Sequence, residues 1–178
     1  MHRTFAQLFH TTTKNFERHY NKLEPLFFKG ITSERHIWQT LSKRLRAKPQ
    51  PKLSFYSVFR DCYSPKTGMF ALAAHLRRHG YKIGLLSNIE KPALKHVVRQ
   101  NYAVFHAAVF SCRAGFAKPE APVYRTMLHK LRLKPHETVF IDNKIENVNG
   151  ARRVGMKAIL FKNVKQTTRQ LHALLRKR

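Results

Sequence analysis

The sequence predicts an α/β protein built on a parallel, doubly wound sheet, with a small helical domain on its N-terminal side. Residues 138–141, TVFI, are β-branched or aromatic and predict a short buried strand. A helix follows, because Val148, Ala151 and Val154 recur at helical spacing, and residues 158–161, AILF, predict a second buried strand. Strands also alternate with helices over the preceding residues, which is typical of a parallel sheet covered on both faces.

Asp142, one of only two aspartates, comes directly after the first of these strands. A polar turn over residues 143–147 leads into the helix, and Gly155 is expected to end it in the left-handed conformation. Ligands of open parallel sheets bind at the carboxyl ends of the strands. Asp142 therefore either contacts a ligand at that edge or caps the helix after it.

Composition indicates one folded domain, with room for a small appendage. The chain has 178 residues and is 43% hydrophobic, which excludes wholesale disorder, and no apolar run has the length of a membrane span. Cys62 and Cys112 show no metal-site spacing and are expected to be reduced thiols. We expect a cytoplasmic protein that does not bind membranes. The basic, amphipathic N-terminus leaves a mitochondrial location as the alternative.

The net charge of +26 is extreme, and it is spread along the whole chain. Such a field attracts polyanions largely without regard to their sequence. Charge alone therefore does not identify a function.

The first 60 residues are predicted to be helical. An apolar stripe of Phe and Tyr residues is interrupted at Thr11–Thr13, and Pro25 and Gly30 are expected to form a turn. Thr32 or Ser33 can cap the next helix, and residues 48–52, KPQPK, read as a linker.

Beyond the linker, Ser64-Pro65 predicts a helix start, and Gly80 its end. The elements expected next are a strand at 81–86, a helix at 92–99, a strand near 108–110, a loop at 111–119 and then a helix that carries Val123, Met127 and Leu131.

Three polar side chains stand at strand ends or in the loops beside them: Ser87, Lys118 and Asp142. Taken singly, Ser87 would be a helix cap and Lys118 a solvated loop lysine. Together, a hydroxyl, a cation and a carboxylate that can bind Mg²⁺ can hold a phosphoryl group.

These residues lie in three segments that resemble motifs II, III and IV of the haloacid dehalogenase-like (HAD) superfamily. The segments are LLSN at 85–88, GFAKPEAPVY at 115–124 and VFIDNKIENVNGARRVGMKAILF from 139. The resemblance implies a HAD-type, Rossmann-like core with a helical cap inserted near the N-terminus. It implies catalytic and substrate-binding roles for Ser87 and Lys118, substrate binding by Asn88, and a Mg²⁺ ligand at Asp142.

The chain departs from the family pattern at two places. Members often have Asp-Asp at the start of motif IV, whereas Asn143 takes the second position here and can only support the metal ligand through hydrogen bonds. The other departure is motif I, the central strand that ends in the nucleophilic Asp-x-Asp, which has no counterpart. Asp61 has no strand before it and no partner acid. We therefore expect an in-frame upstream extension encoding an apolar run and Asp-x-Asp; a late start, a decayed gene or a pseudoenzyme would each account for such a chain.

The resemblance implies a Mg²⁺-dependent phosphatase of small phosphorylated metabolites. We expect this chain to be inactive, because it lacks the nucleophile. The alternative is a pseudoenzyme that binds nucleic acid or another polyanion through its basic surface. The expected domains are a helical cap at 1–60, an α/β core at 61–162 and a basic C-terminal helix at 163–178.

Overall fold

The computed structural model of the protein describes residues 1–47, 53–98 and 103–175, so the predicted linker at 48–52 lies outside the described residues. The chain forms two compact units. Unit 1 comprises Met1–Pro65, Asn88–Asn101 and Phe110–Ala117, and unit 2 comprises Lys66–Ser87, Tyr102–Val109 and Lys118–Arg178.

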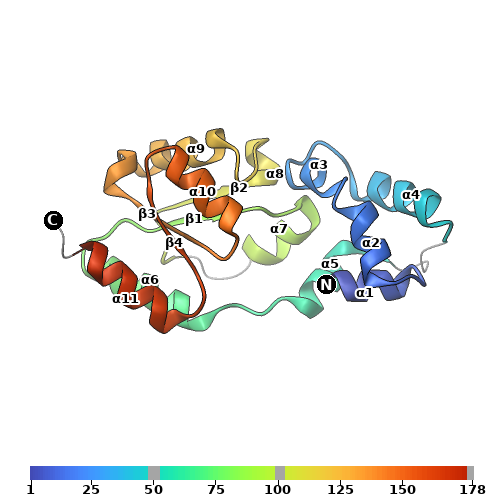
Figure 1. The fold of residues 1–178 in the computed structure, drawn as a ribbon, viewed down its shortest axis with the longest axis horizontal. Helices are drawn as coiled ribbons and strands as arrows, with labels where there is room; N and C mark the ends of the chain where they lie inside the picture. The colour runs from blue at the N-terminus through green and yellow to red at the C-terminus, as the bar shows by residue number, and fades with distance from the viewer. Residues whose placement is uncertain (48–52, 99–102, 176–178) are drawn as a thin grey trace. The chain divides into compact units, whose positions relative to one another are not determined.

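Unit 1 is helical (Figure 1). Its helices are α1 (His2–Leu8), α2 (Thr13–Tyr20), α3 (Glu24–Phe28), α4 (Glu34–Leu45), α5 (Phe55–Cys62), α7 (Lys91–Val98) and α8 (Ser111–Ala114). The predicted break at the threonines is present, because Thr12 caps α2 and accepts a hydrogen bond from the Asn15 amide at 3.2 Å. Ser33 caps α4 in the same way, at 3.2 Å from the His36 amide. Buried aromatic rings fill the interior, with those of Phe5 and Phe16 stacked 5.9 Å apart.

Several local predictions for unit 1 and for the start of unit 2 differ from the structure. Of the turn predicted at Pro25 and Gly30, the part at Gly30 is present, with φ of +67°. Pro25 instead lies inside α3, where a proline near the first helical position is tolerated because its missing amide has no partner there anyway. The segment predicted as the loop 111–119 contains the short helix α8. The helix expected to start at Ser64-Pro65 begins at Thr67, since Lys66, with ψ of 81°, still has a non-helical backbone.

Unit 2 contains the strands and the helices that cover them (Figure 1). The strands are β1 (Gly84–Ser87), β2 (Ala107–Phe110, whose last residue belongs to unit 1), β3 (Val139–Asp142) and β4 (Lys157–Leu160). The helices are α6 (Thr67–Arg78), α9 (Ala121–Leu131), the 3₁₀ turn η1 (Pro135–Glu137), α10 (Ile145–Arg153) and α11 (Val164–Leu175). Gly155 has φ of +87° just after α10, as predicted.

The strands form two separate two-stranded sheets, β1–β2 and β3–β4. β3 and β4 are parallel, in a register that pairs Val139 with Lys157 and Asp142 with Leu160. Within the part of the chain that the structure describes, no strand joins the two sheets. The predicted α/β class with parallel strands is confirmed.

Helices cover both faces of the β3–β4 sheet, as the doubly wound prediction requires (Figure 1). On one face Leu72 of α6 and Leu171 of α11 pack against Ile159 of β4. On the other face the ring of Tyr124 from α9 meets that of Phe140 edge to face, with centroids 5.3 Å apart. In the described ranges, no helix is both long and apolar enough to cross a bilayer.

Candidate functional site

Lys118 connects the carboxyl ends of β1 and β3. Its Nζ atom donates a hydrogen bond to the carbonyl oxygen of Leu86 at 3.0 Å and pairs with Oδ2 of Asp142 at 2.7 Å. The side chains of Lys118 and Asp142 are only 10% and 7% exposed. Lys118 is therefore not the solvated loop lysine that its local sequence allowed.

The Asp142 carboxylate is held in one orientation by groups of its own segment. Oδ1 accepts hydrogen bonds from the backbone amide of Lys144 at 2.9 Å and from Nδ2 of Asn147 at 3.0 Å. The bond to the amide two residues ahead is the local turn that aspartate favours at helix starts. Asp142 thus supports the start of α10 and also presents Oδ2 to Lys118.

Tyr124 and Gly150 hold α10 against the segment that carries Lys118. The Tyr124 hydroxyl donates to the backbone oxygen of Asn147 at 2.7 Å. Burial raises the pKa of Tyr124, and the nearby Asp142 charge adds to the effect, so its hydroxyl stays a neutral donor. A Cβ on Gly150 would lie 2.7 Å from the backbone oxygen of Pro119, which follows Lys118 through a cis peptide bond.

Ser87 directly follows Leu86 at the end of β1 and is half-buried. It does not cap the next helix, because α7 begins four residues later at Lys91. Ser87, Lys118 and Asp142 all belong to unit 2, whereas Asn88 belongs to unit 1. Asn143 lies exposed in the turn, and the amide side chain that contacts Asp142 is that of Asn147.

The other aspartate has a different environment. Asp61 lies in α5 of unit 1, its side chain is 64% exposed, and its Oδ1 lies 2.8 Å from Nε of Arg60. A carboxylate paired with arginine on a surface helix has none of the burial that tunes a catalytic carboxyl group.

The Asp142 carboxylate can bind a magnesium ion, but only as the single protein ligand of that ion. A carboxylate has about four lone-pair positions, and three hydrogen bonds from Lys118, Lys144 and Asn147 use most of them. Over the described residues, no group of three His, Cys, Asp or Glu side chains could hold a metal ion. Mg²⁺ commonly completes its shell with water and substrate oxygens, so Oδ2 of Asp142 could supply one position.

Two contributors to this site were not predicted from the sequence. The backbone oxygen of Leu86 has no sequence signature. Asn147 did have one, because it stands four residues before Ala151 on the buried face of α10, where a polar residue needs a partner. Its partner is Asp142.

A family profile described as "haloacid dehalogenase-like hydrolase" matches residues 2–155. Rat bifunctional epoxide hydrolase 2 is 29% identical over 139 residues, which is 73% of this chain and 25% of that protein. The sesquiterpene phosphatase astK of Aspergillus oryzae is 28% identical over 130 residues, which is 70% of this chain and 66% of that protein. The chain thus spans from a quarter to about two thirds of the length of these relatives.

Solved structures share the fold. A HAD-family enzyme from Bacteroides thetaiotaomicron, solved as a magnesium complex, superposes with a TM-score of 0.72. It is 19% identical and covers 90% of this chain and 83% of its own. At this identity the likeness shows the fold alone.

Proposed function

Because the chain belongs to the haloacid dehalogenase-like hydrolase family, we propose that Ser87, Lys118 and Asp142 form a phosphoryl-binding site of phosphatase descent. One observation carries the proposal: the buried Lys118 ammonium bridges the carboxyl ends of two strands, Leu86 of β1 and Asp142 of β3. A fixed cation at this edge of an α/β sheet suits an anionic ligand. The substrate class would be a small phosphorylated metabolite.

Each residue would have a separate task. The Lys118 ammonium would neutralise the charge of a phosphoryl oxygen, and the Ser87 hydroxyl, one residue beyond Leu86, would donate a hydrogen bond to it. A substrate-binding role for Asn88, the next residue along the chain, remains a prediction from the sequence. A Mg²⁺ ion bound at Oδ2 of Asp142 would offset further negative charge on the phosphoryl group.

The same residues do not supply a nucleophile. The aspartyl-phosphate chemistry that the family resemblance implies needs an aspartate that attacks phosphorus, and the two aspartates of this chain are Asp61 and Asp142. Asp61 is exposed and paired with Arg60, while Asp142 is committed to Lys118 and Asn147. We therefore propose that the 178-residue chain binds phosphate but does not turn over a phosphomonoester.

Calorimetric titration with inorganic phosphate, with and without Mg²⁺, tests the binding step. We expect a dissociation constant of about 1 mM or weaker, since few groups contact the anion, and a loss of about tenfold in Lys118→Ala. Lys165→Ala, which removes the same charge from an exposed position of α11, is the matched control. If both variants weakened phosphate binding equally, the effect would come from net charge alone, and the proposed site would be contradicted.

Turnover of p-nitrophenyl phosphate with Mg²⁺ tests the second step, and none is expected. Mg²⁺-dependent turnover that Asp61→Asn abolishes would show that Asp61 is the nucleophile. If turnover survives Asp61→Asn but is lost in Asp142→Asn, Asp142 takes part in chemistry as well as binding.

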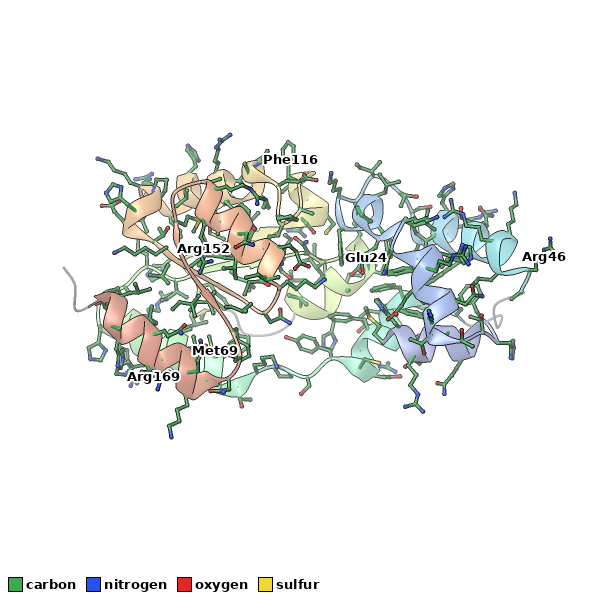
Figure 2. The ribbon with its side chains drawn as sticks, viewed as in Figure 1. Glu24, Arg46, Met69, Phe116, Arg152 and Arg169 are labelled. Carbon is green, nitrogen blue, oxygen red and sulfur yellow. The ribbon has the colours of Figure 1, made fainter. Side chains whose placement is uncertain are left out.

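The net charge of +26 favours a second candidate function, a non-catalytic binder of nucleic acid or another polyanion. Arg46, Arg152 and Arg169, labelled in Figure 2, belong to three different parts of the chain, which illustrates how widely the basic residues are spread. Dispersed charge supports weak, sequence-independent attraction. A cytoplasmic location, with a mitochondrial one as the alternative, remains a prediction.

A further inference from the structure

Helices α6 and α11 of unit 2 form a layer that has no acidic side chain. Both helices cover the same face of the β3–β4 sheet and lie side by side (Figure 1). No aspartate or glutamate occurs at residues 62–89 or at residues 147–178, so both helices and the residues that flank them lack carboxylates. The basic residues are spread along the sequence, but in this layer no carboxylate offsets their charge.

The two helices run in the same direction. A Cβ on Gly68, in the first turn of α6, would lie 3.0 Å from the side chain of Val164, where α11 begins. Further along, Leu72 of α6 and Leu171 of α11 belong to one apolar cluster. The amino ends of the helices therefore lie together, and so do their carboxyl halves.

Lys66 and Lys162 lie at the amino end of the layer. The Nζ atom of Lys66 is 5.5 Å from the centroid of the Phe161 ring, and Phe161 directly precedes Lys162. The attraction between an ammonium group and the face of an aromatic ring holds Lys66 near this position. Both lysines are exposed to solvent.

Lys165, Arg169 and His172 form a stripe along α11. They are spaced at i, i+4 and i+7, which places them on one side of a helix, and all three are exposed (Arg169 is labelled in Figure 2). The buried residues of α11 are Thr167 and Leu171, on the opposite side. Like charges four residues apart destabilise a helix, so the pair Lys165 and Arg169 does not stabilise α11.

The carboxyl end of α6 continues the basic surface. Arg78 is exposed there, beside the exposed His75 and His79, whose ring centroids are 4.2 Å apart. Since α6 has 12 residues, the layer is about 18 Å long. Positive side chains therefore extend from one end of the layer to the other.

The layer does not have the features of a membrane-binding surface. A helix that binds at a bilayer surface buries an apolar face among the lipids. The apolar faces of α6 and α11 pack inside unit 2 instead. Of the large apolar side chains on these two fully described helices, only Val164 is exposed, at 36%.

The layer also lacks the aromatic side chains on which single-stranded bases stack. The sequence of α11 has no Phe, Tyr or Trp. The one such residue of α6, Phe70, packs edge to face against Phe105, with ring centroids 5.9 Å apart. A partner that presents phosphates but keeps its bases stacked inside fits this surface better.

We propose that the α6–α11 layer binds the phosphate backbone of double-stranded nucleic acid without reading its sequence. The inference rests on the second candidate function, polyanion binding, and adds the surface and the kind of nucleic acid. A duplex carries one negative charge per about 1.7 Å, so an 18 Å length presents about ten phosphates to the basic side chains.

Fluorescence anisotropy of labelled duplexes of about 20 base pairs, longer than the layer, tests the proposal with the whole chain. DNA and RNA duplexes of one sequence are both used, because the phosphate backbone is common to them and the tighter complex identifies the source. We expect the duplexes to bind more tightly than their separate strands at equal salt. The logarithm of the association constant should fall with the logarithm of salt concentration with a slope of about −4 or steeper.

Two double variants, matched in charge, test the surface. Lys165→Gln with Arg169→Gln removes two positive charges from the layer, whereas Arg125→Gln with Lys130→Gln removes two from exposed positions of α9, on the other face of the sheet. Glutamine has a helix propensity close to that of lysine and arginine, so both proteins should fold. We expect the α11 variant to bind duplex about tenfold or more weakly, with a slope smaller by about 2, and the α9 variant to stay within about twofold of wild type.

The outcomes separate the surface from the function. Equal weakening by the two double variants would overturn the assignment to this layer and leave the polyanion-binding function in place. If the wild-type chain bound no duplex, both would be overturned. Tighter binding of single strands, or binding to phosphatidylserine vesicles at a salt concentration that abolishes duplex binding, would overturn double-stranded nucleic acid as the partner.

Discussion

Lys118 and Asp142 lie 24 residues apart in the sequence, yet their Nζ and Oδ2 atoms meet at 2.7 Å with both side chains almost fully buried. A buried charge needs its partner, because the interior does not solvate an isolated ion. Replacing either side chain alone should therefore lower the stability of the protein more than replacing both.

We predict that Lys118→Met and Asp142→Asn each lower the free energy of unfolding by about 3 kcal/mol or more, while the double variant recovers part of the loss. Urea denaturation of the four proteins gives the coupling energy directly. Lys165→Ala, on the surface of α11, should leave stability within about 0.5 kcal/mol of wild type. Additive losses would mean that the two groups do not stabilise each other.

Gly150→Ala should destabilise the protein although alanine is the better helix former. The new Cβ would lie 2.7 Å from the Pro119 oxygen, a backbone atom that cannot rotate away, and 2.8 Å from the Tyr124 hydroxyl. Overpacking of this kind costs about 1–3 kcal/mol, more than the roughly 1 kcal/mol gained in helix propensity.

Thermal unfolding and phosphate binding should be measured together for this variant, since moving Pro119 also moves Lys118. Asn149→Ala, exposed on the same helix, is the control and should have little effect. If the Gly150→Ala protein were as stable as wild type, α10 could shift without loss of stability, and the prediction would be wrong.

Stability should fall as pH rises towards and through about 8, because of Glu90. This side chain is 2% exposed, and burial, with a smaller contribution from Glu24, raises its pKa from an ordinary 4.5 to about 8. Between these values the folded state keeps a proton that the unfolded state has lost. The stabilisation is therefore complete below about 4.5 and is lost as pH rises through about 8.

Glu90→Gln keeps the size and removes the ionisation, so it should flatten this part of the stability profile. At about pH 9 the variant should be more stable than wild type by a few kcal/mol, at about 1.4 kcal/mol per pKa unit. Denaturant midpoints over the pH series provide the measurement, and Glu146→Gln, at an exposed position of α10, is the control. A profile parallel to that of wild type would exclude Glu90 as its cause.

Nucleic acid should bind weakly, without sequence preference and with steep salt dependence. The reason is that the positive charge is extreme but not concentrated in one segment. Fluorescence anisotropy with two unrelated single-stranded sequences, across a salt series, measures both properties. Selective binding of one sequence that persisted at about 0.2 M salt would instead favour the polyanion-binding function over phosphate binding.

The elements with local signals could be predicted from the amino-acid sequence. The unit from β3 through α10 to β4 was predicted to within a few residues, because a short apolar run, a helical repeat and Gly155 each act over neighbouring residues. The order of Ser87, Lys118 and Asp142 along the chain also indicated the family.

Local signals were less reliable where neighbouring residues allow more than one conformation. Ser64-Pro65 has the composition of a helix start, but Lys66, with φ of −80° and ψ of 81°, has a non-helical backbone and α6 begins at Thr67. The short helices α3 and α8 have too few residues to show a period, so their sequences read as a turn and a loop.

The partners of the site residues, by contrast, depend on contacts between segments that are far apart in the sequence. Lys118 reads as a loop lysine until the fold brings Leu86, 32 residues before it, and Asp142, 24 residues after it, within hydrogen-bond distance. The pairing of β1 with β2 and of β3 with β4 likewise depends on the tertiary structure. The hydrophobic pattern of a strand determines which of its faces is buried. Which other strands it pairs with depends on contacts between segments tens of residues apart, and no local sequence pattern encodes those contacts.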